Sequence, residues 1–161
     1  MENREFFMAC SANEHARFRS VFAAVPDGDL DWRPEPKARS ARELIGHIIG
    51  HEQDLVELID DGVIHHRNVV PFGNMEEALS IFDAANEQLT GKLTGMDDES
   101  WGKQSQMLVG DYVAWEGSAG EIMWGFLFDK IHHRGQLSTY LRPMGGKVPA
   151  IYGPSADSES H

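Results

Sequence analysis

Apolar residues recur at helical spacing in four long segments of the chain. In residues 2–24, phenylalanine, valine and cysteine side chains repeat at three- and four-residue intervals and predict an amphipathic helix. A second helix is predicted from an N-cap at Ser40, where Glu43 completes a capping box, to the turn residues 60–62. Each of these two segments is therefore predicted to form a helix with one apolar face and one polar face.

Two further helices follow in the second half of the chain. Residues 74–93 begin with Asn74 as N-cap and carry alanine, isoleucine, phenylalanine and leucine on one face. The last helix begins near Ser118 and ends at Pro143 and the glycine pair 145–146, because proline cannot continue a helix and glycine accepts the left-handed closing conformation. The pattern therefore predicts an all-α four-helix bundle.

The segment between the third and fourth helices does not follow helical spacing. Residues 95–120 contain large apolar side chains, interrupted by glycines at positions 102, 110, 117 and 120. We expect one long irregular crossover here, with a short extended piece at residues 106–109, that covers one end of the bundle.

Composition limits the number of domains. A chain of 161 residues with 41% apolar and 25% charged content is typical of one globular domain, which we assign to residues 1–153. Residues 154–161 are polar, and we expect a disordered tail there. A single cysteine, Cys10, excludes an internal disulfide, and the first residues lack a signal-peptide pattern, so we expect a cytoplasmic protein.

Net charge narrows the classes of partner. Twenty-six acidic and fourteen basic residues give a formal charge of −12. Nucleic acids and anionic membrane surfaces require a basic footprint, so we predict that the protein binds neither. No apolar run approaches the length of a transmembrane helix. A small-molecule substrate or a protein partner remains.

Candidate chemistry lies on the second and fourth helices. Asp129 and His133 are four residues apart, so about 40° separates them around the helix axis and both side chains can reach one point. His47 and His51 have the same spacing on the second helix. Three protein ligands, namely His47, Asp129 and His133, would form a divalent-metal site with open positions for water or substrate.

Alternatives to this metal site remain open from spacing alone. Asp129 and His133 could instead form a buried polar cluster with Lys130 or Arg134 at its rim. His51 could be a fourth ligand, a base beside the metal or an edge residue, and His132 is rotated about 100° from His133. The adjacent residues 65–66, both histidines, are interpreted as exposed loop residues.

Two stretches resemble a known family. The run IHHRGQLSTYLRPMGGKVPAIYG, residues 131–153, is similar to the C-terminal signature of the DinB/YfiT-like metalloenzymes, and DWRPEPKARSARELIGHIIGHE, residues 31–52, is similar to their second-helix signature. The resemblance covers nearly the whole chain. It implies an up-down-down-up bundle of four helices and a homodimer.

The resemblance also implies site residues. The first and last metal histidines of the family match His47 and His133, whereas Asp129 stands where the family most often has a histidine. Zinc, nickel or manganese would suit such a ligand set. By the same resemblance, a low-molecular-weight thiol would bind at the open metal position, and Arg134, Arg142 or Tyr152 would orient an anionic substrate group. His51, Arg134 and Tyr152 are therefore candidates for a catalytic role.

Two functions follow as hypotheses. The first is a metal-dependent enzyme, a thiol-cofactor S-transferase or a related hydrolase, that activates a thiol or water at the His47, Asp129 and His133 site. The second is a non-catalytic protein of a stress response that binds a metal or small ligand and acts as a dimer. The sequence leaves the question of enzymatic activity open.

Overall fold

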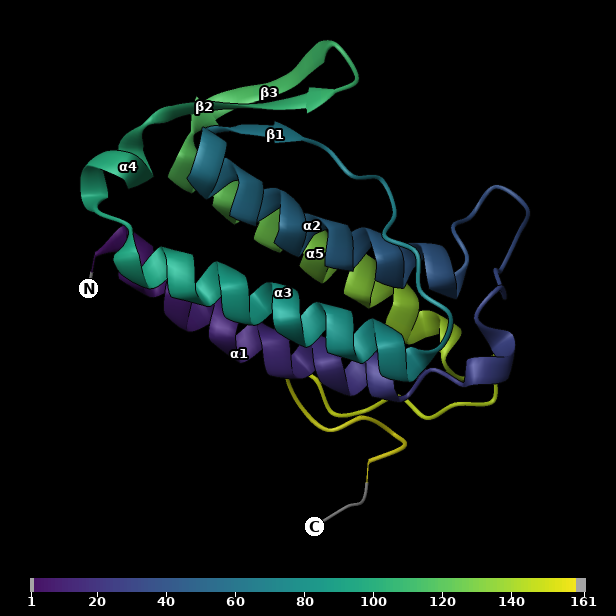
Figure 1. Ribbon diagram of the computed structural model, residues 1–161. Coiled ribbons are helices and arrows are strands. Elements are labelled where there is room, and N and C mark those ends of the chain that lie inside the picture. Colours follow the sequence, from purple (N-terminus) through teal and green to yellow (C-terminus); the bar gives the residue numbers. More distant parts are fainter. Residues whose placement is uncertain (1, 159–161) are drawn as a thin grey trace.

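Four helices of 21 or 22 residues form the body of the molecule (Figure 1). The structure is a computed structural model that describes residues 2–158. The end of the tail that we expected to be disordered, residues 159–161, lies outside the described residues. The helices are α1 (Asn3–Ala23), η1 (Asp27–Asp29), α2 (Ala41–Asp61), α3 (Met75–Gly95), α4 (Asp98–Gly102) and α5 (Ala119–Tyr140).

Side-chain caps fix the starts of three long helices where the sequence predicted them. The Ser40 hydroxyl accepts a hydrogen bond from the backbone N–H of Glu43, whose carboxylate accepts one from the backbone N–H of Ser40. Ser118 and Glu121 form the same capping box at the start of α5. Asn74 caps α3. The predicted helix starts are thus confirmed. They could be predicted because capping depends on residues that are close together in the sequence.

The long helices pack around two apolar clusters with a polar layer between them. α2 packs against α3 and α5, and α1 packs against the same two helices from the other side. One apolar cluster surrounds Phe22 and the other surrounds Phe7. On α1 the buried Glu14 falls between the two clusters, and on α5 Lys130 and Arg134 do the same. Polar contacts inside the bundle therefore join its two apolar halves.

The expectation of an all-α fold is wrong in one respect, because the structure contains a small three-stranded sheet. β1 (Val63–His65) pairs in parallel with β2 (Gln104–Val109), which pairs antiparallel with β3 (Tyr112–Ser118). The segment that we expected to be an irregular crossover is thus α4 followed by a β-hairpin, and the extended piece predicted at residues 106–109 belongs to β2.

Turn chemistry explains the hairpin. Val109 pairs with Tyr112, so only Gly110 and Asp111 form the loop. Gly110 has a φ of 58°, in the left-handed region that glycine adopts without steric cost. The glycine and aspartate between two runs of apolar residues are a hairpin signal that the sequence carried.

The sheet lies against α2 and α5, on the side of the molecule away from α1 and α3 (Figure 1). Ile64 of β1 is completely buried and anchors the sheet in the core. The sheet thereby covers the surface at which α2 and α5 meet. Among the described residues, none of the helices combines the length and apolar character needed to cross a membrane.

Candidate metal centre

The site is built on the shared surface of α2 and α5. Three imidazole nitrogens surround one carboxylate oxygen, Oδ2 of Asp129. The Nε2 atom of His51 lies 2.8 Å from it, that of His133 3.2 Å and that of His47 3.6 Å. The structure therefore brings together the three residues that the sequence singled out as ligands, and adds His51 to them.

The donors of His47, His51 and Asp129 lie within 4.8 Å of one another, a spacing that could hold a metal ion. His133 approaches the same carboxylate from the next turn of α5, and its ring centre is 4.7 Å from that of His47. Imidazole nitrogen and carboxylate oxygen are the donors that zinc and other borderline divalent cations accept. The donor chemistry thus fits a metal.

Hydrogen bonds fix which ring nitrogen of each predicted histidine ligand is free. Nδ1 of His47 lies 2.7 Å from the backbone carbonyl oxygen of Asn68, which can only accept, so Nδ1 carries the proton. Nδ1 of His133 lies 2.8 Å from Oε1 of Gln136. In the neutral rings of both histidines, Nε2 therefore presents a lone pair to the carboxylate of Asp129.

Burial and mutual contact shift the pKa values of these groups. Contact with the imidazole of His133, and next with those of His47 and His51, holds the pKa of the Asp129 carboxyl far below its usual range. Asp129 in turn raises the pKa of His133, and burial lowers the pKa of His47. The group therefore keeps an ionised carboxylate among imidazoles over the whole neutral range.

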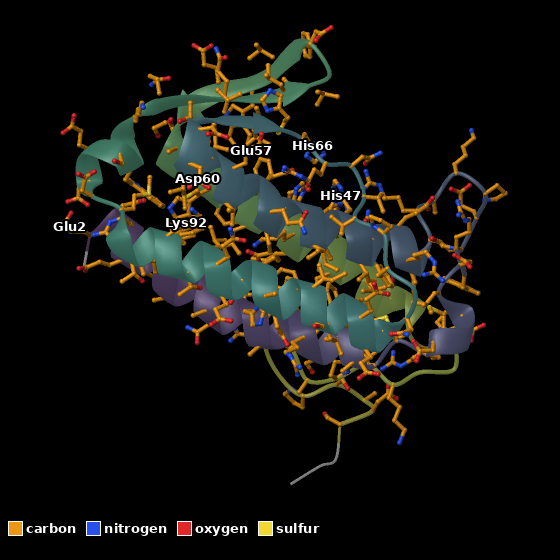
Figure 2. The ribbon with its side chains drawn as sticks, in the orientation of Figure 1. Glu2, His47, Glu57, Asp60, His66 and Lys92 are labelled. Carbon is orange, nitrogen blue, oxygen red and sulfur yellow. The ribbon has the colours of Figure 1, made fainter. Side chains whose placement is uncertain are left out.

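A second polar group adjoins the first through His51. Asp54, one turn further along α2, has a completely buried side chain. Its Oδ2 atom lies 2.7 Å from Nδ1 of His66 and 3.8 Å from Nδ1 of His51, and its Oδ1 atom accepts from Arg67. Figure 2 shows His66, after β1, close to His47 on the side of α2 that faces the sheet.

A cavity of 490 Å³ opens over the imidazoles. The sheet and α5 supply apolar walls, and four histidines and Asp129 supply its polar side. It is lined by His47, His51, His66, Met107, Trp115, Gly125, Phe126, Asp129 and His133. A ligand bound at the carboxylate would therefore contact both donors and aromatic carbon.

The structure does not bring Arg134 and Tyr152, two catalytic candidates from the sequence, to this cavity. Arg134 is buried on the opposite face of α5, where it pairs with Glu14 of α1. Its other guanidinium nitrogen lies 2.6 Å from the hydroxyl of Tyr152, which also donates to Glu14. Residues 133 and 134 point in different directions because about 100° separates neighbours on a helix. Arg142 forms an exposed ion pair with Asp157.

Sequence reasoning missed His66 and Trp115. His66 was interpreted as an exposed loop residue, but its side chain is only 15% exposed, whereas that of His65 is 67% exposed. Neighbouring residues of a strand point to opposite faces, so the alternation from Val63 onward could have separated the two histidines. Trp115 lay in the segment interpreted as irregular.

Comparison with protein families identifies the chain. Residues 12–137 match the profile of the DinB superfamily. The matched region covers well over half of the chain, so the protein belongs to the DinB superfamily, and the resemblance seen in the sequence is confirmed. A search of curated proteins finds no significant match.

Solved structures show the same fold. A DinB-like protein from Bacillus subtilis has a TM-score of 0.71 at 15% identity, over 96% of this chain and 99% of that one. A DinB-like protein from Bacillus cereus ATCC 10987 has a TM-score of 0.74 at 16% identity, over 92% and 97%. A mycothiol-dependent maleylpyruvate isomerase has a TM-score of 0.56 at 10% identity, over 89% of this chain and 61% of that one. At these identities the similarity establishes the fold alone.

Proposed function

We propose that this protein is a divalent-metal-dependent enzyme in which His47, Asp129 and His133 hold the metal. When bound, a zinc, nickel or manganese ion would supply a Lewis acid that lowers the pKa of a coordinated thiol or water. The reaction class that we propose is S-transfer with a low-molecular-weight thiol, or a related hydrolysis.

One observation carries this proposal: each predicted histidine ligand donates its Nδ1–H to a dedicated acceptor. His47 donates to the carbonyl of Asn68, and His133 donates to Gln136. Metal-binding histidines commonly donate the proton on their other ring nitrogen in this way, which fixes the tautomer and ring orientation. The arrangement leaves both Nε2 lone pairs facing one carboxylate.

His51 has a distinct part in the proposed site. Its Nε2 atom lies 2.8 Å from Oδ2 of Asp129, at hydrogen-bond distance, whereas Nε2 of His47 is 3.6 Å away. We assign His51 to donating a hydrogen bond that orients Asp129. By the family resemblance, this position most often holds a histidine, and the side chain of Asp129 is shorter. The carboxylate must therefore be held in one orientation to reach the metal.

The thiol part of the proposal has two supports. The cavity over the site combines apolar walls, from Met107, Trp115 and Phe126, with the imidazoles, and so suits an organic ligand with one metal-binding atom. A protein of similar fold is described as mycothiol-dependent.

Elemental analysis of untagged protein, dialysed without chelator, tests the metal site. We expect His133→Ala to contain one divalent metal ion per chain fewer than wild-type protein. His132→Ala is the matched control, because His132 is exposed and neighbours His133 without facing Asp129. Equal metal content in His133→Ala and wild type, or no metal after soaking, would contradict the proposal. A metal-loaded protein that leaves a panel of thiols and electrophiles unchanged would contradict the enzymatic part.

A second candidate is the non-catalytic dimer, which an exposed aromatic surface favours. Phe6 of α1 and Phe128 of α5 are 52% and 62% exposed, and both rings pack against Trp124. Large exposed apolar side chains that cluster together are typical of interaction surfaces. Sedimentation of wild type and Phe6→Ser/Phe128→Ser tests this: we expect a dimer that the double variant converts to monomer.

A further inference from the structure

A second group of metal-ligating side chains lies beside the first and shares one residue with it. His51, Asp54 and His66 each place a donor atom within 4.8 Å of the other two. His51 and Asp54 are one turn apart on α2, and His66 follows β1 directly. We propose that these three side chains bind a second divalent cation, of the borderline class represented by Zn²⁺.

The Nδ1 atom of His51 carries the argument. It is buried and has no hydrogen-bond partner among the described residues, and the residue as a whole is 4% exposed. Its Nε2 atom faces the carboxylate of Asp129 at 2.8 Å, so in the neutral ring the proton is on Nε2 and Nδ1 is a bare lone pair. The buried lone pair has lost its contact with water and has gained nothing in exchange.

The nearest carboxylate cannot satisfy that lone pair. Oδ2 of Asp54 lies 3.8 Å from Nδ1 of His51, and an ionised carboxylate only accepts hydrogen bonds. Two acceptors therefore face each other inside the protein. A cation between them would satisfy both, which a hydrogen bond cannot do without an additional proton.

Asp54 and His66 complete the donor set. Arg67 holds Oδ1 of Asp54 at 2.9 Å, which leaves Oδ2 directed toward the two imidazoles. The carboxylate is completely buried, so a cation would also compensate its desolvated charge. On binding, the neutral ring of His66 would change tautomer, losing its proton from Nδ1 and taking one up from solvent at Nε2, and the Nδ1 lone pair would take the place of the hydrogen bond to Asp54. Two imidazoles and one carboxylate suit Zn²⁺.

This second site does not rest on the proposed function. It uses Nδ1 of His51, Asp54 and His66, whereas the first site uses His47, Asp129 and His133. Variants can therefore separate the two. The exposed neighbour His65, which bonds to Glu57, provides a matched control of the same residue type.

The test is Zn²⁺ stoichiometry after equilibrium dialysis of untagged protein, with circular dichroism to establish that each variant is folded. We expect two zinc ions per wild-type chain and per His65→Ala chain. His66→Ala and Asp54→Asn should each hold one, His133→Ala should hold one, and His133→Ala/His66→Ala should hold none. Asp54→Asn keeps the shape of the side chain, so it remains informative if His66→Ala does not fold.

Each other result has a definite meaning. Folded His66→Ala and Asp54→Asn proteins that hold as much zinc as wild type would overturn the second site. One ion in wild type, lost from His133→Ala and kept in His66→Ala, would overturn it as well and leave the first site standing. One ion lost from His66→Ala and kept in His133→Ala would support the second site and contradict the proposed function.

Discussion

Oε1 of Gln136 lies 2.8 Å from Nδ1 of His133, one turn away on α5. The amide nitrogen of Gln136 faces Nε2 of His132 at 3.2 Å, so the amide has one orientation that serves both rings. Gln136 is exposed and has no place in the core. Its contact with His133 fixes the tautomer that directs Nε2 toward Asp129.

Gln136→Ala should therefore weaken metal binding while leaving the fold intact. The loss of a hydrogen-bond acceptor behind a metal-binding histidine typically reduces affinity by about 10- to 100-fold. Gln136→Glu keeps an acceptor at the same place and should retain affinity near that of wild type. Competition with a chromophoric chelator measures both variants, and equal affinities for Gln136→Ala and wild type would show that Gln136 has no part in the site.

The buried pair between Lys130 and Glu52 should dominate the stability of the polar layer. Their charged atoms are 2.7 Å apart and the two side chains are 1% and 2% exposed. Lys130→Met would leave Glu52 ionised and unpaired in the core, at a cost of about 3–5 kcal/mol in the free energy of unfolding. Lys130→Met/Glu52→Leu should recover most of that loss, because the double variant replaces both charges with apolar groups. Urea denaturation of the three proteins measures the difference.

A surface ion pair provides the control. Lys92 pairs with Asp60, and both side chains are partly exposed (Figure 2). Lys92→Met should change the free energy of unfolding by less than about 1 kcal/mol, because solvent screens the pair. A similar effect of the two lysine substitutions would contradict the assignment of Lys130 to a desolvated pair.

Features of the fold that depend on residues close together in the sequence could be predicted, whereas features that depend on distant residues could not. The capping residues Ser40, Asn74 and Ser118 act on neighbours three positions away, so their helix starts could be predicted from sequence alone. The sheet could not be predicted in full, because the parallel pairing of β1 and β2 joins residues 43 positions apart and depends on tertiary packing. The hairpin turn at Gly110 was a local signal that we did not use.

The same distinction holds for the candidate site. Asp129 and His133 share a helix, the spacing of His47 and His51 on the second helix pointed to the remaining ligand, and the resemblance to a family matched His47. His66 reaches the site only through the return of the chain after β1, which no spacing rule predicts. The inward direction of Arg134 was also missed, because its partner Glu14 is 120 residues away.

Trp115 should respond to a substitution at Gly125. The ring of Trp115 packs directly on the α-carbon of Gly125, so that a Cβ atom there would lie 1.9 Å from the ring. Gly125→Ala should displace the indole, change the tryptophan fluorescence and cost about 1–3 kcal/mol in stability. On the same helix, a Cβ atom at Gly135 would have no atom from elsewhere in the described part of the chain within 4 Å, so Gly135→Ala should instead stabilise the protein by about 0.5–1 kcal/mol. An unchanged emission spectrum in Gly125→Ala would show that Trp115 does not form this wall of the cavity.

Asp54 should give the metal-free protein a defined acid dependence. Burial alone would raise the pKa of its carboxyl, but the nearby imidazole of His51 and the hydrogen bonds from His66 and Arg67 outweigh burial and lower the pKa below the usual 3.8. A carboxyl with a lowered pKa in the folded state adds stability above its unfolded pKa, and that stability is lost as the pH falls through the folded value.

In the presence of chelator, wild type should therefore be more stable than Asp54→Asn at pH 5–7, and the difference in the free energy of unfolding should shrink steadily below about pH 4. Asp31→Asn, which affects an exposed ion pair with Arg42, should show no comparable pH-dependent difference. A constant difference between wild type and Asp54→Asn from pH 7 to pH 3 would mean that Asp54 stabilises the fold by shape and not by charge.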